Sequence, residues 1–209
     1  MKQPLLIIGA GNVGGFIAYN LSLFEQEFEL IGFLDDDASK VGTNCFGYPV
    51  LGNTESLKDY TPDTSVAIGI ASPQVKRIIS QKVVSAGFQL PSLIAQNAWL
   101  SEGVKVGRGC IIYPHVSVNH LTNIGDFVII NMNCAIGHDC TIGNYCSLAP
   151  GVNLGGFTHL EEAIDFGIGA CTIQNIKVGQ SAVIGGQAML IADVPPGGRV
   201  VGVPGRPLL

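Results

Sequence analysis

The sequence has few charged residues, and they form no basic cluster. Only 13% of its 209 residues are Asp, Glu, Lys or Arg, and the formal net charge is −5. A protein that binds along nucleic acid needs clustered cations to neutralise phosphates, so we expect no nucleic-acid partner. With 47% hydrophobic residues and 28 glycines, little sequence is left for a solvated surface, which favours a compact protein that forms oligomers.

Long hydrophobic runs are also missing. No apolar segment reaches the roughly 20 residues that a transmembrane helix requires, so we expect no membrane partner. The first residues, MKQPLLIIGAG, lead directly into a strand-like run without the features of a signal peptide. These features predict a cytoplasmic protein, in which the six cysteines are expected to stay reduced.

A nucleotide-binding pattern occupies the first ninety residues. The apolar run of residues 5–8 precedes Gly9, Gly11 and Gly14 in the spacing G-x-G-x-x-G, and apolar residues at helical spacing follow through Phe24. A second strand, FELIGFL, ends at three aspartates, where dinucleotide folds carry an acidic residue. Two further segments complete a short βαβαβ unit, one half of a dinucleotide-binding fold. SVAIGIA is predicted to be a strand, and the following SPQVKRIISQKVVSAGF a helix.

The size of this half limits what it can bind. A full dinucleotide site usually needs two such halves, and the sequence changes character near residue 90. The space therefore suits a mononucleotide or a nucleotide sugar better than NAD. A nicotinamide-dependent oxidoreductase is the alternative that the glycines permit, and a structural interpretation is that they serve only close helix–strand packing.

A period of six residues runs from Ile94 to Leu190. Of the 17 residues at this spacing 16 are apolar, with Thr172 the exception, and glycine follows eight of them. Neither the period of a helix nor that of a strand holds this register over about a hundred residues. The spacing predicts a parallel β-helix in which three hexads close a coil, so that residues 18 apart stack about 4.8 Å apart. We expect two domains, over residues 1–90 and 91–209.

The stretch NCAIGHDCTIGNYCS contains three cysteines six residues apart, Cys134, Cys140 and Cys146. Together with Cys110 they occupy the fifth hexad position, where the residues are small or β-branched almost throughout. Free cysteine packs as a small hydrophobe, and the C-x-x-C spacing of a zinc site is absent. We predict that these cysteines fill the interior and act neither as ligands nor as nucleophiles.

The same stretch carries the pair His138 and Asp139. A neutral imidazole is a suitable general base, and a carboxylate can fix its tautomer. Adjacent residues on a flat strand point to opposite faces, so the pair can cooperate only where the backbone turns a corner. His120 lies one coil earlier and is expected to stack on His138. No histidine precedes His115 to complete the three-histidine zinc site of carbonic-anhydrase-type β-helices, so we expect no metal.

Five motifs together resemble a family of bacterial sugar acetyltransferases: IIGAGNVGG, FLDDD, VAIGIA, IGHDCTIG and VVGVPGRPL. The family includes sialic acid O-acetyltransferases and the N-acetyltransferases of UDP-bacillosamine and GDP-perosamine pathways, and the resemblance spans essentially the whole chain. It implies an α/β Rossmann-like domain followed by a left-handed parallel β-helix. It also implies a homotrimer, with acetyl-CoA as co-substrate bound between neighbouring β-helices.

The resemblance assigns roles to individual residues. The general base of the family aligns with His138, and its neighbouring acid with Asp139. The other aligned contacts are Gly11, Asn12, Val13, Asp35, Asp36 and Gly69 for the nucleotide sugar, and Ser147, Ile168 and Gly186 for acetyl-CoA. Several relatives carry His where this sequence has Ser147 and Val13. The first departure concerns the contact to the acetyl group, and the second favours a different sugar.

We therefore expect an acetyl-CoA-dependent acetyltransferase of a nucleotide-linked amino sugar in surface glycan biosynthesis, without a covalent enzyme intermediate. The alternatives are a sialic acid or other sugar O-acetyltransferase and a non-catalytic β-helix scaffold. Two outward apolar columns, Ile111 with Ile129 and Phe127 with Tyr145, predict the subunit interface of the trimer. The sequence leaves open the sugar, the nucleotide, the acylated atom and the length of the acyl chain.

Overall fold

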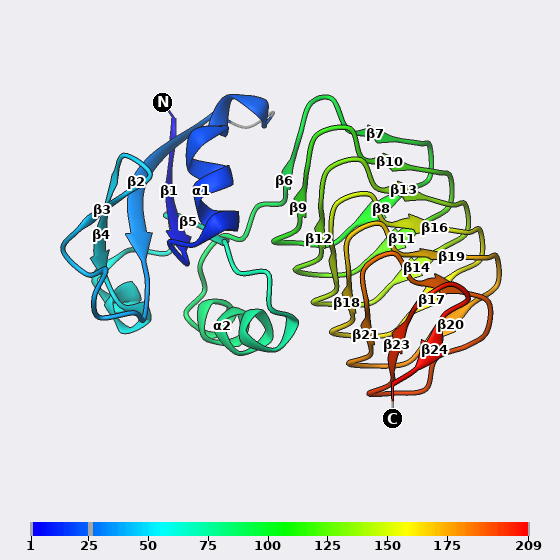
Figure 1. The fold of residues 1–209 in the computed structure, drawn as a ribbon. Coiled ribbons are helices and arrows are strands. Elements are labelled where there is room, and N and C mark those ends of the chain that lie inside the picture. The colour runs from blue at the N-terminus through cyan, green and yellow to red at the C-terminus, as the bar shows by residue number, and fades with distance from the viewer. Residues whose placement is uncertain (1, 25–26, 209) are drawn as a thin grey trace.

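The computed structural model describes residues 2–24 and 27–208, which form an α/β domain beside a β-helix (Figure 1). The α/β domain contains β1 (Gln3–Ile8), α1 (Asn12–Tyr19), η1 (Leu21–Leu23), β2 (Phe28–Leu34), β3 (Asn44–Cys45), β4 (Tyr48–Gly52), η2 (Thr54–Asp59), β5 (Ser65–Ile68) and α2 (Pro73–Ser85), where η denotes a 3₁₀ helix. Its strands form one sheet in the order β3-β4-β2-β1-β5, parallel except for the β3–β4 hairpin.

The predicted βαβαβ unit is confirmed at its two ends and is wrong in the middle. A hairpin and a 3₁₀ helix connect β2 to β5, where a βαβαβ unit has an α-helix, and the predicted helix SPQVKRIISQKVVSAGF is α2, which follows β5. The hairpin turns at Phe46 and Gly47, whose φ angles of 53° and 83° are those of a two-residue turn that follows strand twist. α1 also ends at Tyr19, earlier than predicted, and Phe24 forms a bridge with Ala95 of the β-helix.

The β-helix consists of very short strands. They are β6 (Leu93–Ile94), β7 (Trp99–Leu100), β8 (Lys105–Val106), β9 (Ile111–Ile112), β10 (Ser117–Val118), β11 (Asn123–Ile124), β12 (Ile129–Ile130), β13 (Ala135–Ile136), β14 (Thr141–Ile142), β15 (Ser147–Leu148), β16 (Asn153–Leu154), β17 (His159–Leu160), β18 (Asp165–Phe166), β19 (Cys171–Thr172), β20 (Lys177–Val178), β21 (Val183–Ile184), β22 (Met189–Leu190), β23 (Arg199–Val201) and β24 (Arg206–Pro207).

These strands stack into three sheets that form the sides of a prism. We call the sheet from β6 to β24 the docking face (order β24-β23-β21-β18-β15-β12-β9-β6), the sheet of β7 to β22 the second face, and the sheet of β8 to β20 the third face. Partners lie 18 residues apart, as between Ser117 and Ala135, which confirms the predicted coil length. The fold is the expected left-handed parallel β-helix.

Each corner of the prism is a turn with a residue in the left-handed backbone region. Leu121, Asp139 and Phe157 lie on one such corner, with φ angles of 57°, 55° and 60°. The apolar hexad residues point inward and are buried from Ile112 onward. The exception, Thr172, is also buried, and its hydroxyl accepts a hydrogen bond from the Gly155 N–H at 3.0 Å. The interior thus satisfies its polar group.

The α/β domain covers the first four strands of the docking face. Ile111 and Ile129 are 1% and 2% exposed, whereas Trp99 on the second face is 56% exposed. Phe16 of α1 stacks on Tyr113 with ring centroids 3.9 Å apart, and Arg77 of α2 lies 6.0 Å from the Tyr145 ring centroid.

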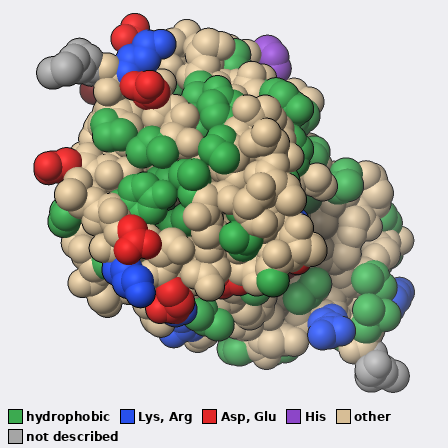
Figure 2. Space-filling model, turned by 90° about the vertical axis from the view of Figure 1, so that its left-hand side faces the viewer, with side chains coloured by type: hydrophobic (Ala, Val, Ile, Leu, Met, Phe, Trp, Pro, Cys, Tyr) green, Lys and Arg blue, Asp and Glu red, His purple; other side chains and the backbone are tan. Residues whose placement is uncertain are grey.

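This packing corrects the predicted subunit interface. The column of Ile111 and Ile129 and the buried Phe127 face the chain's own α/β domain, and Phe127 belongs to the same hydrophobic cluster as Ile79 and Val83 of α2. The prediction that these columns form a contact between subunits is therefore wrong. Seen from the side of the α/β domain, the surface shows scattered Lys and Arg side chains, several of them beside Asp or Glu, with hydrophobic side chains between these charged groups (Figure 2).

Candidate active site

A cavity of about 450 Å³ lies at the carboxyl ends of β1, β2 and β5. Its walls include all six residues expected to contact the nucleotide sugar: Gly11, Asn12, Val13, Asp35, Asp36 and Gly69. Ligands of open α/β sheets bind at this edge, beyond the ends of the strands. The structure therefore brings the predicted nucleotide-sugar contacts together around one space.

The glycines of this cavity have different roles. A Cβ atom on Gly14 would collide with the carbonyl oxygen of Gly9, and one on Gly69 would lie 2.7 Å from the Gly14 Cα. These two glycines let α1 approach the strands, as the structural interpretation of the motif requires. A Cβ atom on Gly11 would meet nothing within 4 Å, because Gly11 borders the open space of the cavity.

The two aspartates at the end of β2 are held by the surrounding backbone. Asp35 accepts hydrogen bonds from the Ala10 N–H at 2.7 Å and from the Lys40 ammonium at 3.0 Å. Burial alone would raise the pKa of Asp35, but the hydrogen bonds from the Asp37 N–H, Lys40 and the Ala10 N–H outweigh it and lower this pKa below its usual value. Asp36 accepts from the Thr54 N–H at 2.8 Å.

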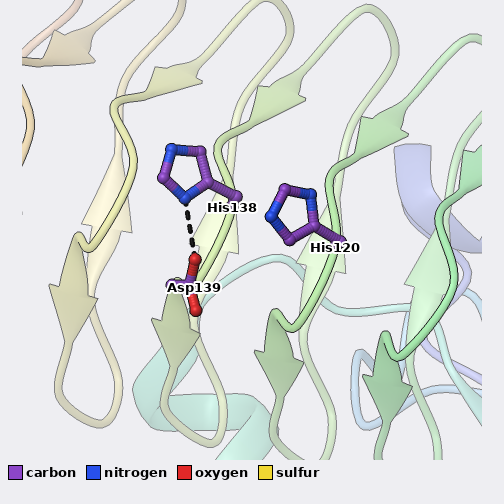
Figure 3. A group of neighbouring side chains, drawn as sticks. All are labelled: His120, His138 and Asp139. Atoms are coloured by element: carbon purple, nitrogen blue, oxygen red, sulfur yellow. Dashed lines mark hydrogen bonds and ion pairs between the residues drawn. The ribbon is translucent and has the colours of Figure 1, made fainter.

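His138 and Asp139 lie at the corner between the second and third faces, between β13 and β14 (Figure 3). The left-handed turn at Asp139 brings the adjacent side chains to the same side, and His138 Nδ1 lies 2.8 Å from Asp139 Oδ2. The side chains are 40% and 31% exposed, so a substrate can reach them. The backbone therefore turns a corner at this pair, as cooperation between two adjacent side chains requires.

Two aromatic neighbours hold the His138 ring. The His120 ring stacks on it with centroids 5.2 Å apart and an interplanar angle of 9°, which confirms the predicted stacking, and Phe157 contacts it edge-on at 5.0 Å. One possible ligand atom from each of His120, His138 and Asp139 lies within 4.8 Å of the others. A cation there would compete with the His138–Asp139 hydrogen bond and the contact of His120 Nδ1 with Asn119, each 2.8 Å long.

The three residues expected to contact acetyl-CoA do not share one environment. Ile168 and Gly186 stack at the corner between the docking and second faces, and Ile168 is 61% exposed. Ser147 lies within the docking face and is only 6% exposed. Its role at acetyl-CoA stays a prediction, and the structure shows that its hydroxyl already has two partners in the α/β domain, Ala71 and Lys76.

Within one chain the cavity and His138 lie on opposite sides of the β-helix. The α/β domain covers the docking face, whereas the corner with His138 joins the other two faces. A ligand held in the cavity of one chain is therefore separated from His138 of that same chain by the prism. The structure assembles each half of the expected site but does not join them within a single chain.

Two family models match the chain: PglD N-terminal domain, over residues 4–83, and bacterial transferase hexapeptide (six repeats), over residues 121–156. The GDP-perosamine N-acetyltransferase of Escherichia coli O157:H7 is 29% identical, over 96% of this chain and 94% of its own length. The acetyltransferase domain of PglB from Neisseria gonorrhoeae FA1090 is 30% identical with a TM-score of 0.91, over 99% of this chain and 100% of that one. The chain belongs to the hexapeptide-repeat sugar acetyltransferases.

Other solved structures of this acetyltransferase fold agree. WeeI from Acinetobacter baumannii AYE is 28% identical, with a TM-score of 0.85 over 98% of this chain and 99% of that one. PerB from Caulobacter crescentus, at 24% identity and a TM-score of 0.89, covers 99% of this chain and 97% of its own and supports the fold. Over the residues that the structure describes, no helix is both long and apolar enough to cross a membrane.

Four of the six cysteines of this acetyltransferase fill the interior of the β-helix, as predicted. Cys110, Cys134, Cys140 and Cys146 are at most 1% exposed, and all are free thiols. Each thiol lies 3.1 to 3.4 Å from a carbonyl oxygen of the next coil, 15 residues on. Burial raises the pKa of Cys146 to about 12 and that of Cys134 to about 11. These thiols stay protonated and are poor nucleophiles.

Sequence reasoning missed two lysines of this acetyltransferase. Lys40 lines the cavity and is paired with Asp35, but the loop that carries it has no periodic pattern to mark it. Lys76 is 1% exposed on the inner side of α2. A signal for Lys76 does exist in the sequence, because it lies three residues before the buried Ile79 and seven before the buried Val83, at apolar helical spacing.

Proposed function

We propose that the chain transfers the acetyl group of acetyl-CoA to the amine of a nucleotide-linked amino sugar, with His138 as the general base. The observation that carries the proposal is the 2.8 Å contact between His138 Nδ1 and Asp139 Oδ2 on an exposed corner. The family and the names of two relatives support it, since one is a GDP-perosamine N-acetyltransferase and another was solved with acetyl coenzyme A.

The Asp139 carboxylate sets the state of the imidazole. It accepts a hydrogen bond from Nδ1–H, which leaves the lone pair of His138 Nε2 free to accept a proton. Gly156, one coil on, leaves room in front of this nitrogen, because a Cβ atom there would lie 2.8 Å from Nε2. An amine approaching through this space can lose its proton to Nε2.

The reaction needs one proton acceptor and one electrophile. The sugar nitrogen attacks the thioester carbonyl carbon, a C–N bond forms, and the C–S bond to CoA breaks as the tetrahedral intermediate collapses. His138 Nε2 takes the proton of the amine and Asp139 stabilises the resulting imidazolium, while backbone N–H groups stabilise the oxyanion. CoA leaves as the thiol or thiolate, and no enzyme residue is acylated.

The proposed donor and acceptor sites are divided between the two domains. The cavity of residues 1–90 holds the nucleotide, with Gly11, Asn12, Val13 and Gly69 in its walls and Asp35 and Asp36 near the ribose or base. Acetyl-CoA lies along the β-helix of residues 91–209, beside Ile168 and Gly186. Asp36→Ala should raise KM for the nucleotide sugar and leave KM for acetyl-CoA unchanged.

Asp37→Ala is the matched control for this division. Asp37 follows directly in the sequence, but its carboxylate bonds Ser39 and does not line the cavity. It should leave both KM values unchanged. Equal effects of Asp36→Ala on the two substrates would contradict the division of labour.

We further propose that the enzyme is a homotrimer whose active sites form between subunits, since one chain separates the cavity from His138. Co-expression of Asp36→Ala and His138→Ala chains tests this. If the two residues act from different subunits, one of the three sites in each mixed trimer pairs an intact cavity with an intact His138. Activity then returns at a sugar concentration too low for the Asp36→Ala enzyme alone. No recovery in mixed trimers, or a monomer in light scattering, would contradict a shared site.

Product analysis tests the function itself. The purified protein is incubated with acetyl-CoA and a panel of UDP- and GDP-linked sugars with and without a free amine, GDP-perosamine included. We expect acetylation of an amino sugar, with NMR placing the acetyl group on nitrogen. Acetylation of hydroxyl groups alone would favour an O-acetyltransferase, and binding of neither acetyl-CoA nor any nucleotide sugar would favour a scaffold. The cytoplasmic location and the role in surface glycan synthesis stay predictions.

A further inference from the structure

A buried lysine connects the α/β domain to the β-helix. Lys76, in the first turns of α2, is 1% exposed, and its ammonium donates hydrogen bonds to the Cys146 carbonyl at 3.2 Å and to Ser147 Oγ at 2.9 Å. Both acceptors belong to the docking face, around β15. A cation is expensive to bury, so a lysine retained at this position calls for a role beyond packing.

The hydrogen-bond network continues into the wall of the nucleotide cavity. Ser147 accepts from Lys76 and donates its own hydroxyl proton to the Ala71 carbonyl, at 2.6 Å. Ala71 lies in the loop between β5 and α2, and it lines the cavity together with Gly69 and Val75. The β-helix thus holds this wall at two points, at the loop through Ala71 and at α2 through Lys76.

We propose that Ser147 and Lys76 are positioning residues that fix the wall of residues 69–72 for the nucleotide sugar. The inference rests on the proposed function, and it gives Ser147 a role different from the acetyl-CoA contact that the resemblance implies. Neither residue lines the cavity, so each acts through the loop and through α2. A loop held this way is ordered before the ligand binds, which removes an ordering cost from binding.

The groups around Lys76 stabilise its charge only in part, so the ammonium depends on its hydrogen bonds to the Cys146 carbonyl and the Ser147 hydroxyl. Besides Ser147 it faces the thiols of Cys146 and Cys110, which burial keeps protonated, and the Asp165 carboxylate of the next docking-face strand. Burial lowers the pKa of Lys76 to about 7, and the surrounding groups, Asp165 among them, only partly offset this effect. Loss of the Ser147 hydroxyl would therefore leave a buried cation and a carbonyl each short of a partner.

Steady-state kinetics with GDP-perosamine and acetyl-CoA separate the two roles of Ser147. Ser147→Ala should raise KM for the nucleotide sugar roughly tenfold, the size of one buried hydrogen bond, with kcat and KM for acetyl-CoA within about twofold of wild type. Lys76→Met should act in the same direction by a smaller factor, because Ser147 still donates to Ala71. Ser117→Ala, at the same hexad position on the second face, is the control and should change neither KM.

A rise in KM for acetyl-CoA alone, or no change in either KM, would overturn the positioning role while leaving the proposed function intact. If the wild-type enzyme acetylates no nucleotide sugar, the proposed function fails. Amide hydrogen exchange then tests by itself whether Ser147 positions the cavity wall. Faster exchange at residues 69–72 in Ser147→Ala than in Ser117→Ala would support positioning, and equal exchange would overturn it.

Discussion

The buried ammonium of Lys76 predicts an unusual dependence of stability on pH. Its pKa falls from the ordinary 10.5 to about 7 on folding, mainly through burial. Between these values the unfolded chain binds more protons than the folded one, so the free energy of unfolding rises with pH and falls as pH drops toward 7. From pH 7 to 8.5 the gain from this one group is on the order of 1–2 kcal/mol, and one proton limits the slope to about 1.4 kcal/mol per pH unit.

Urea denaturation at several pH values measures this slope. The buried cysteines have pKa values above their ordinary ones and work in the opposite direction, but only above about pH 9, so the window ends at 8.5. Lys76→Met keeps the side-chain length without the charge, and subtracting its profile removes every other group. A wild-type slope equal to that of Lys76→Met would refute the reasoning, because it would mean that folding leaves the proton affinity of Lys76 unchanged.

Three further substitutions test the corner of His138. Gly156→Ala places a methyl group 2.8 Å from His138 Nε2 and should lower kcat at least tenfold without unfolding the protein, as circular dichroism and turnover together would show. Asp139→Asn keeps the shape and should lower kcat by less than His138→Ala does; a rate equal to wild type would remove Asp139 from the mechanism. Cys140→Ala should change turnover by less than about twofold, and a large loss measured in the same assay would contradict an inert interior thiol.

The β-helix could be predicted almost completely from the sequence because each hexad places the same kinds of residue at the same positions. An apolar residue every six positions sets both the coil length and the residues that point inward. The burial of Cys134 and Cys146 followed from that register. Even the stacking of His120 on His138 is a consequence of their separation by one coil.

The parts that escaped prediction depend on how the two domains meet. Periodicity shows that Ile111 and Phe127 point out of the β-helix, but it carries no information on what covers them, and the chain's own α/β domain does. The same contact determines the surroundings of Ser147 and Lys76. The β3–β4 hairpin was missed for another reason, since Asn44 and Cys45 form too short a strand to show alternation.

The proposed reaction depends on His138 as the base, and the kcat of His138→Ala tests this role most directly. We expect a loss of roughly 10² to 10⁴-fold on the accepted nucleotide sugar, with the oligomer intact by light scattering and acetyl-CoA affinity unchanged by calorimetry. His115→Ala, which removes another exposed imidazole, should retain wild-type turnover. A His138→Ala enzyme with near-normal kcat would contradict the mechanism, and loss of the folded oligomer along with activity would mean that His138 serves the structure.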